Sequence, residues 1–227
     1  DSFIAALSVT AGEVVKTGAG TQSSTSVSNN AVLRISHSGG FGAGGLSIGA
    51  ANSSTGRVEI SGNISVLTGK TVTINARTSN TDAIVSNGDN TFGGNISIST
   101  GGSLCAVASN TGTLELTGNI SSLATGSRSI TLRGAAAGRV SGTVTNGSGT
   151  LGLVKSGVGT WTLDGIHTFT GSVAVQQGTL IVKQPLPTQP VSVSSGATLS
   201  GDGALGGDVT ISGIHSPGNA VGTQAAS

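Results

Sequence analysis

The chain has few of the residues that carry charge, aromatic surface or covalent cross-links. Of its 227 residues, 8% are charged and 2% aromatic, and neither Met nor Tyr occurs. Globular domains usually carry about 25% charged residues. In this chain, therefore, side-chain hydroxyl and amide groups must provide most of the hydrated surface. The net charge of +1 comes with no cluster of Lys or Arg, which argues against a nucleic-acid partner. No apolar run approaches the roughly 18 residues of a membrane span.

Cysteine and proline are also scarce. The one cysteine, Cys105, excludes an internal disulfide, and its strand-like setting SLCAVAS predicts a buried, inert thiol. Three of the four prolines lie in residues 184–190. Because proline cannot occupy an interior strand, we expect this segment to loop out between strands. The same alternation of residues resumes after it, so residues 1–227 are predicted to form a single domain.

Short alternating segments fill the rest of the chain. In residues 57–61, Val58 and Ile60 point to one side of a strand and Glu59 to the other. The segment 56–76 returns as 112–134, and no stretch has the spacing and caps of a helix. Such repetition indicates units that bury their apolar faces only by stacking. We predict an all-β, single-stranded parallel β-helix, right-handed, with roughly 10 coils.

Residues 153–182, LVKSGVGTWTLDGIHTFTGSVAVQQGTLIV, resemble the autotransporter-associated β-strand repeat, also called the passenger-associated transport repeat. The match is specific from residue 153 to about residue 223 and weaker over the rest of the chain. The resemblance implies a parallel β-helix on a secreted or surface-displayed bacterial protein, often an adhesin or a structural surface protein. The repeat is a scaffold and implies no catalytic residue and no cofactor. The positions that carry the resemblance are Lys155, Gly157, Gly159, Thr160, Leu163, Thr168, Phe169, Thr170, Gly171, Gly178, Thr179 and Leu180.

The acidic and histidine residues offer little catalytic chemistry. Glu59 and Glu115 occupy equivalent positions in the two copies 56–76 and 112–134 and could align on one outward face. Coils separate them, however, and paired glycosidase carboxylates lie within about 10 Å, so we expect solvated surface residues. Asp164 and His167 resemble a triad fragment but fall in a variable turn, and a structural role is expected. No metal site is predicted, since the histidines are scattered and the glycine/aspartate segment 201–209 lacks the repeated calcium-binding nonapeptide.

Two further features bear on surface binding. Trp161 either fills the core or, if outward, offers a contact for a sugar or a second subunit; we favour the core. Where an inward residue lies between two threonines, both face solvent, and stacked pairs could form a flat hydroxyl array suited to ice. The pairs do not recur at one period; they are Thr71/Thr73, Thr143/Thr145, Thr160/Thr162 and Thr168/Thr170.

These observations favour a non-enzymatic, exported bacterial β-solenoid that serves as a structural or adhesive element, secreted or at the cell surface. With no evident cap at either end, we expect rods that associate end to end into a filament, with polysaccharide or other cell-surface contacts as further partners. A carbohydrate-binding or carbohydrate-active β-helix is the alternative. It predicts a groove with convergent acids or exposed aromatics, the candidates for which are Trp161, Phe3, Phe41, Phe92 and Phe169. Ice binding is a third alternative.

Overall fold

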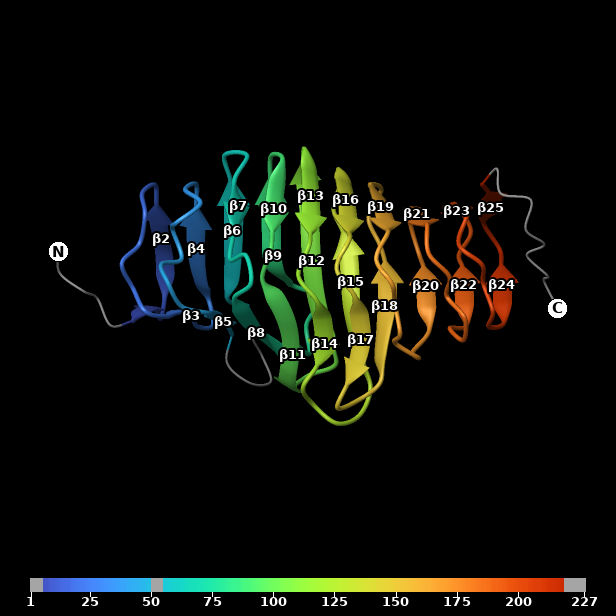
Figure 1. Cartoon of the computed structure of the whole chain (residues 1–227), viewed down its shortest axis with the longest axis horizontal. Helices are drawn as coiled ribbons and strands as arrows, with labels where there is room; N and C mark the ends of the chain where they lie inside the picture. The colour runs from blue at the N-terminus through green and yellow to red at the C-terminus, as the bar shows by residue number, and fades with distance from the viewer. Residues whose placement is uncertain (1–5, 50–54, 219–227) are drawn as a thin grey trace.

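The computed structural model describes residues 6–49 and 55–218, and every regular element in these ranges is a β-strand. Strands run across a long rod, and the first and last described strands lie at its opposite tips (Figure 1). Each named strand pairs in parallel with a strand of a neighbouring coil, and those inside a sheet pair with the coils on both sides. This confirms the predicted all-β parallel β-helix. The right-handed winding stays a prediction.

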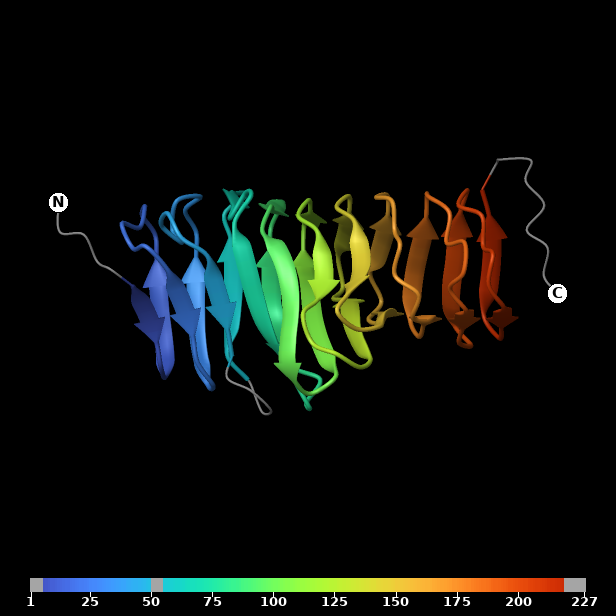
Figure 2. The same cartoon turned by 60° about the horizontal axis from the view of Figure 1, so that its bottom comes forward.

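Three sheets run along the rod (Figure 2). Sheet A has seven strands: β1 (Leu7–Val9), β3 (Thr25–Val27), β5 (Leu46–Ile48), β8 (Thr71–Ala76), β11 (Asn95–Gly101), β14 (Ile120–Ser122) and β17 (Val144–Gly147). Sheet B has ten: β2 (Gly12–Lys16), β4 (Ala31–Ile35), β6 (Arg57–Ser61), β9 (Asp82–Asn87), β12 (Leu104–Thr111), β15 (Arg128–Arg133), β18 (Leu151–Lys155), β20 (Val173–Val175), β22 (Val191–Val193) and β24 (Val209–Ile211). Sheet C has eight: β7 (Ser65–Val66), β10 (Asn90–Phe92), β13 (Thr113–Leu116), β16 (Ala137–Val140), β19 (Thr160–Leu163), β21 (Gly178–Val182), β23 (Ala197–Gly201) and β25 (Ile214–Pro217).

The cross-section of the rod changes along its length. Coils from β5 to β19 contribute a strand to each sheet, whereas the first coils lack sheet C and those after β19 lack sheet A. The described residues form about eight turns. The longest sheet, sheet B, has ten strands, in line with the roughly 10 coils that the sequence predicts. In the C-terminal coils, loops replace sheet A, and the buried Phe169 and Leu186 close the core there.

The core consists of aliphatic ladders in which each side chain stacks on its counterpart in the next coil. One ladder in sheet B runs through Leu33, Val58, Ile84 and Val107, all at 0% exposure. Each such side chain contributes about 1.5–3 kcal/mol by leaving water. Alternation along each strand is therefore the physical source of the fold. Cys105 lies in a neighbouring ladder and is buried, as predicted, and its burial raises the pKa of the thiol to about 12.

The sequence repeat and the structural coil have different phases. The copy 56–76 begins in sheet B with β6, whereas the copy 112–134 begins in sheet C with β13. The true coil length also varies: Val58 pairs with Ile84, 26 residues on, and Val173 pairs with Val191, 18 residues on. The two sequence segments resemble each other because each sheet of the rod requires the same pattern of strand, turn and strand. The predicted equivalence of the two copies is therefore wrong.

The proline-rich segment lies between β21 and β22, as expected, but it is not simply looped out. Leu186 bridges Leu205 in the next coil, and both Leu186 and Gln189 are fully buried. The segment therefore forms part of the wall that replaces sheet A. The coils stack without interruption on both sides of it.

Candidate functional site

The residues of the 153–182 repeat hold neighbouring coils together. Lys155 faces inward, in the ladder between Leu132 and Val175, and has 0% exposure. Its Nζ donates hydrogen bonds to the carbonyl oxygens of Ser156, Gly157 and Gln177 at 3.1, 2.7 and 2.8 Å. Burial lowers the pKa of Lys155 to about 8. This side chain therefore ties one corner of the rod to the corner of the next coil.

The glycines of the repeat allow close backbone contact between coils. A Cβ at Gly159 would lie 2.1 Å from the Ala136 carbonyl oxygen, and one at Gly171 would lie 2.4 Å from that of Leu151. Gly178 has a φ of +68°, and a Cβ there would also approach Lys155 Nζ. Such positions exclude other residues on steric grounds. Gly157, with a φ of +75°, likewise lies close to the Gly134 carbonyl oxygen of the preceding coil. The repeat positions other than Lys155 and the glycines divide into buried residues (Leu163, Phe169, Leu180) and partly or fully exposed threonines (Thr160, Thr168, Thr170, Thr179).

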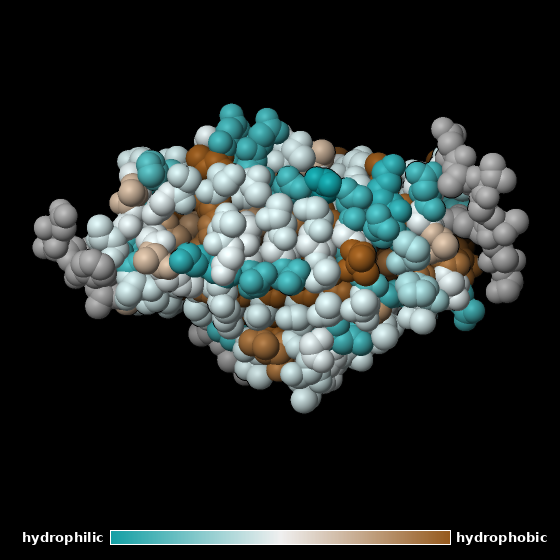
Figure 3. All heavy atoms as spheres, viewed as in Figure 1, coloured by the Kyte–Doolittle hydropathy of each residue, from teal (hydrophilic) through white to brown (hydrophobic). Residues whose placement is uncertain are grey.

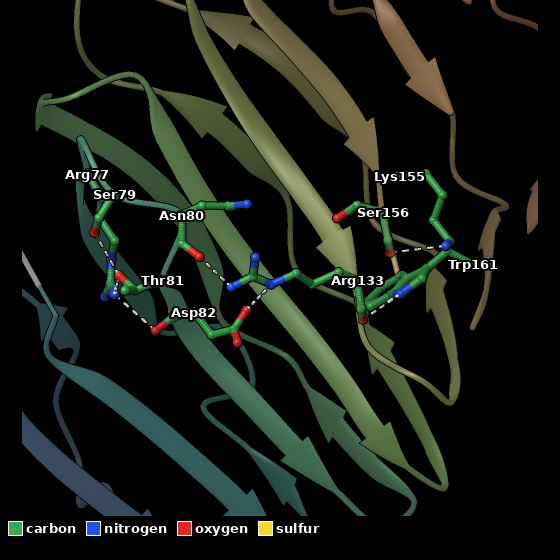
Figure 4. Close-up of polar contacts among 9 residues, drawn as sticks. All are labelled: Arg77, Ser79, Asn80, Thr81, Asp82, Arg133, Lys155, Ser156 and Trp161. Carbon is green, nitrogen blue, oxygen red and sulfur yellow. Dashed lines mark hydrogen bonds and ion pairs between the residues drawn. The ribbon is translucent and has the colours of Figure 1, made fainter. Parts of the chain in front are cut away.

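Trp161 is a core residue, as favoured from the sequence. It has 0% exposure, and its Nε1 donates a hydrogen bond of 3.0 Å to the carbonyl oxygen of Arg133 (Figure 4). Its ring packs over Gly138 of the preceding coil, where a Cβ would come within 2.4 Å of it. The alternative prediction of an exposed contact at Trp161 is wrong. Phe41, Phe92 and Phe169 are also buried, and Phe3 lies outside the described residues.

A polar groove crosses the outer face of sheet B. Its volume is about 430 Å³, and four consecutive coils supply its lining through β6, β9, β12, β15 and the segments before β6 and β9. The lining residues are Thr55, Arg57, Glu59, Asn80, Thr81, Asp82, Val85, Asn110 and Arg133. The face drawn in Figure 3 is mostly pale, with groups of hydrophilic residues and some hydrophobic residues between them.

Ion pairs fix the charged side chains of this groove. Arg133 Nε lies 2.5 Å from Asp82 Oδ1, and Arg133 Nη2 donates to the Asn80 carbonyl oxygen at 2.7 Å (Figure 4). Arg57 Nε lies 2.6 Å from Glu59 Oε1, and Arg34 Nη1 lies 2.8 Å from Glu59 Oε2. The groove therefore presents oriented charged groups whose charges are already balanced.

Arg77 lies beneath the groove and joins its two sides. It is fully buried, and Nη1 donates to Thr81 Oγ1 and to the Asp82 carbonyl oxygen, both at 2.9 Å. Nη2 donates to the carbonyl oxygen of Gly56, which lies between two lining residues. The sequence reasoning missed Arg77, Asp82 and Arg133. The sequence does contain a signal for this site: the polar run RTSNTD at 77–82 interrupts the alternation of apolar and polar residues between two strands.

The acidic residues singled out from the sequence do not come together. Glu59 lies on sheet B and Glu115 on sheet C, so their expected alignment on one face is wrong because the two copies have different phases. Glu115 and Asp164 both bind Arg139 on sheet C. His167 Nδ1 accepts a hydrogen bond from the Val144 amide at 3.2 Å instead of activating a serine. Within residues 6–49 and 55–218, no group of His, Cys, Asp and Glu could hold a metal ion.

The threonine pairs do not form one array. Thr71/Thr73 and Thr143/Thr145 both lie along sheet A, but the coils between them carry Asn95/Ser97 and Asn119/Ser121. Thr160 and Thr162 lie on sheet C, and Thr168 and Thr170 lie in the loop between β19 and β20. The segment 201–209 connects β23 to β24, consistent with the predicted turn.

Comparison with known proteins identifies one segment. Neither a curated protein nor a solved structure matches the chain. The described part of the chain contains no helix able to cross a bilayer. Residues 153–182 match the family model of the passenger-associated-transport-repeat, as the resemblance predicted. This match covers β18 to β21, the coils held by Lys155 and Trp161. The chain is thus a β-solenoid that contains a passenger-associated transport repeat and is consistent with an autotransporter passenger-like β-helix.

Proposed function

We propose that this protein is a non-enzymatic structural scaffold of the passenger type, displayed outside the cell, whose rods associate end to end into a filament. The single observation that carries the proposal is the use of the repeat. Contacts between neighbouring coils are made by Lys155, Trp161 and the glycines of the repeat. A segment of this kind builds length and stiffness in a rod.

The carboxylates support the non-enzymatic part of the proposal. Glu59, Asp82, Glu115 and Asp164 are each bound to an arginine. In each of them a guanidinium group already occupies at least one of the carboxylate oxygens that a catalytic carboxyl would present to a substrate. Paired carboxylates of this kind serve structure more readily than proton transfer.

The outermost described strands support end-to-end association. Ile211 in β24 continues the ladder of Val193, which is 2% exposed, yet Ile211 is 38% exposed. At the opposite tip Val14 pairs with the buried Leu33 and is only half-buried. A coil of a second copy stacked on either strand would cover these side chains and extend the backbone hydrogen bonds.

Electron microscopy of the purified chain over a range of concentrations tests this function. We expect filaments with an axial repeat close to one rod length, and a sedimentation coefficient that rises with concentration. Ile211→Lys should shorten or abolish the filaments, whereas Thr210→Lys, on the outward side of the same strand, should leave them intact. Single rods of wild-type protein at every concentration would contradict the proposal.

A further inference from the structure

The groove on sheet B is more elaborate than a scaffold requires. Its lining places two arginines and two carboxylates across successive coils, together with the amides of Asn80 and Asn110. These ion pairs are partly buried, with side-chain exposures of 20% for Arg133 and 24% for Asp82. Removing such charges from water offsets much of the stability that their pairing contributes. Stacking the coils therefore does not explain why these groups are gathered around a cavity of about 430 Å³.

The buried Arg77 gives the second indication that the groove is a built site. Removing a guanidinium from water is unfavourable unless its hydrogen bonds are satisfied. Arg77 is nevertheless fully buried without a carboxylate hydrogen-bond partner among the described residues, and its Nε has none at all. It links the Gly56 carbonyl on one side to Thr81 and Asp82 on the other. Such a clamp preorganises the lining before any ligand arrives.

The charge balance of the groove limits the ligand. Arg57 and Arg133 face Glu59 and Asp82, so the formal charges of the residues that line the groove cancel. Two further arginines lie outside the lining: Arg34, which pairs with both Glu13 and Glu59, and the buried Arg77. An anionic ligand would be attracted by the two guanidinium groups but repelled by the two carboxylates. A cationic ligand would be attracted by the carboxylates but repelled by the guanidinium groups. A neutral ligand avoids both. Hydrogen bonds to ionised groups are also about twice as strong as those between neutral groups.

The kind of lining residue limits the ligand further. Arginine, carboxylate, amide and threonine groups provide donors and acceptors side by side, which matches vicinal hydroxyls that both donate and accept. Val85 is the one aliphatic lining residue, and in sheet B it pairs with Glu59 of the preceding coil. A volume near 430 Å³ lies within the range of about 300–1,000 Å³ for small-ligand sites.

We propose that this groove binds a neutral oligosaccharide about two sugar units long, hydrogen-bonded to Arg133, Asp82 and the two asparagines and held by a lining that Arg77 positions. Binding is non-covalent and changes no bond of the sugar. The proposal does not require filaments. It goes beyond the scaffold function by giving the rod a lateral binding site for an uncharged glycan.

NMR titration of the ¹⁵N-labelled full chain tests the site. The probes are the neutral disaccharides cellobiose, maltose and lactose, with digalacturonate as the acidic comparison. We expect at least one neutral sugar to produce saturable shifts of the Arg133 side-chain Nε–H and of backbone amides near residues 80–82 and 110. Weak binding, in the millimolar range, is expected for so short a probe. Digalacturonate should bind at least 10-fold more weakly.

Two sets of variants separate binding from folding. Arg133→Gln should weaken binding at least 10-fold, whereas Arg139→Gln, which removes an equivalent ion-paired arginine on sheet C, should leave it unchanged. The double variant Asn80→Ala, Asn110→Ala removes two exposed amides without touching an ion pair and should weaken binding several-fold. Absence of saturable shifts with every neutral sugar, tighter binding of digalacturonate, or unchanged binding by both groove variants would overturn the proposal. Filament formation, measured separately, bears on none of these outcomes.

Discussion

His167 lies in the loop that follows β19 and takes the place of a sheet A strand. Its side chain is buried, and Nδ1 accepts a hydrogen bond from the Val144 amide. Burial lowers the pKa of His167 to about 4, and the nearby Asp164 carboxylate opposes this shift in part. The folded rod therefore holds a neutral histidine at a position where protonation would remove an acceptor.

This position predicts that the rod loses stability in mild acid. The unfolded chain protonates His167 at its ordinary pKa of 6.5 and the folded chain only at about 4. The stabilising contribution is thus complete above pH 6.5 and is lost as the pH falls through 4, with a ceiling of about 3 kcal/mol. Urea unfolding at pH 7, 5 and 4 measures the slope. His167→Gln should flatten it, whereas His37→Gln, at an exposed site, should not. An unchanged slope in His167→Gln would place the acid sensitivity elsewhere.

At the scale of elements, residues in adjacent strands determine each other's size. Trp161 in β19 fills the space left by Gly138 in β16, and Leu180 in β21 follows in the same ladder. A glycine in the interior of a strand, such as Gly138, weakens the strand because it has no side chain to pack. It is kept because the ring of Trp161 occupies the volume that a Cβ would need.

We therefore predict a compensating pair of substitutions. Gly138→Ala alone should destabilise the rod by about 1–3 kcal/mol through overpacking. In a Trp161→Leu background, which is itself destabilised by a cavity, the same Gly138→Ala change should be neutral or stabilising. Chemical denaturation of the four proteins gives the coupling energy. Additive effects would mean that the strands shift apart to accommodate the alanine.

At the scale of the molecule, the three faces of the rod differ in charge. The strands of sheet A contain no charged residue, whereas the ion pairs lie mainly on sheets B and C. Sheet A also ends before the C-terminal coils, where loops take its place. The rod is therefore asymmetric around its axis and along its length, although its sequence pattern looks uniform.

This asymmetry predicts uneven resistance to local unfolding. β15 and β20 both have a neighbour on each side in sheet B, but only the coil of β15 also has a sheet A strand. Hydrogen exchange of β20 amides should be faster than that of β15 amides by roughly 100-fold or more, because fewer ladder hydrogen bonds hold its coil. Mass spectrometry on proteolytic fragments measures this. Equal protection would show that the Phe169 and Leu186 loops stabilise a coil as well as a strand does.

The sequence by itself determined the kind of fold and the core. Alternation at Val58 and Ile60 predicts their burial because a strand sends successive side chains to opposite faces, and the repeat at 153–182 predicts stacked coils. Only the tertiary structure decided which strands share a face. Alternation is the same in every sheet, so Glu59 and Glu115 look equivalent in sequence although they lie on different sheets. The groove likewise depends on coil lengths, which bring Arg57, Asp82 and Arg133 together across coils, and turns set those lengths without leaving a periodic signal in the sequence.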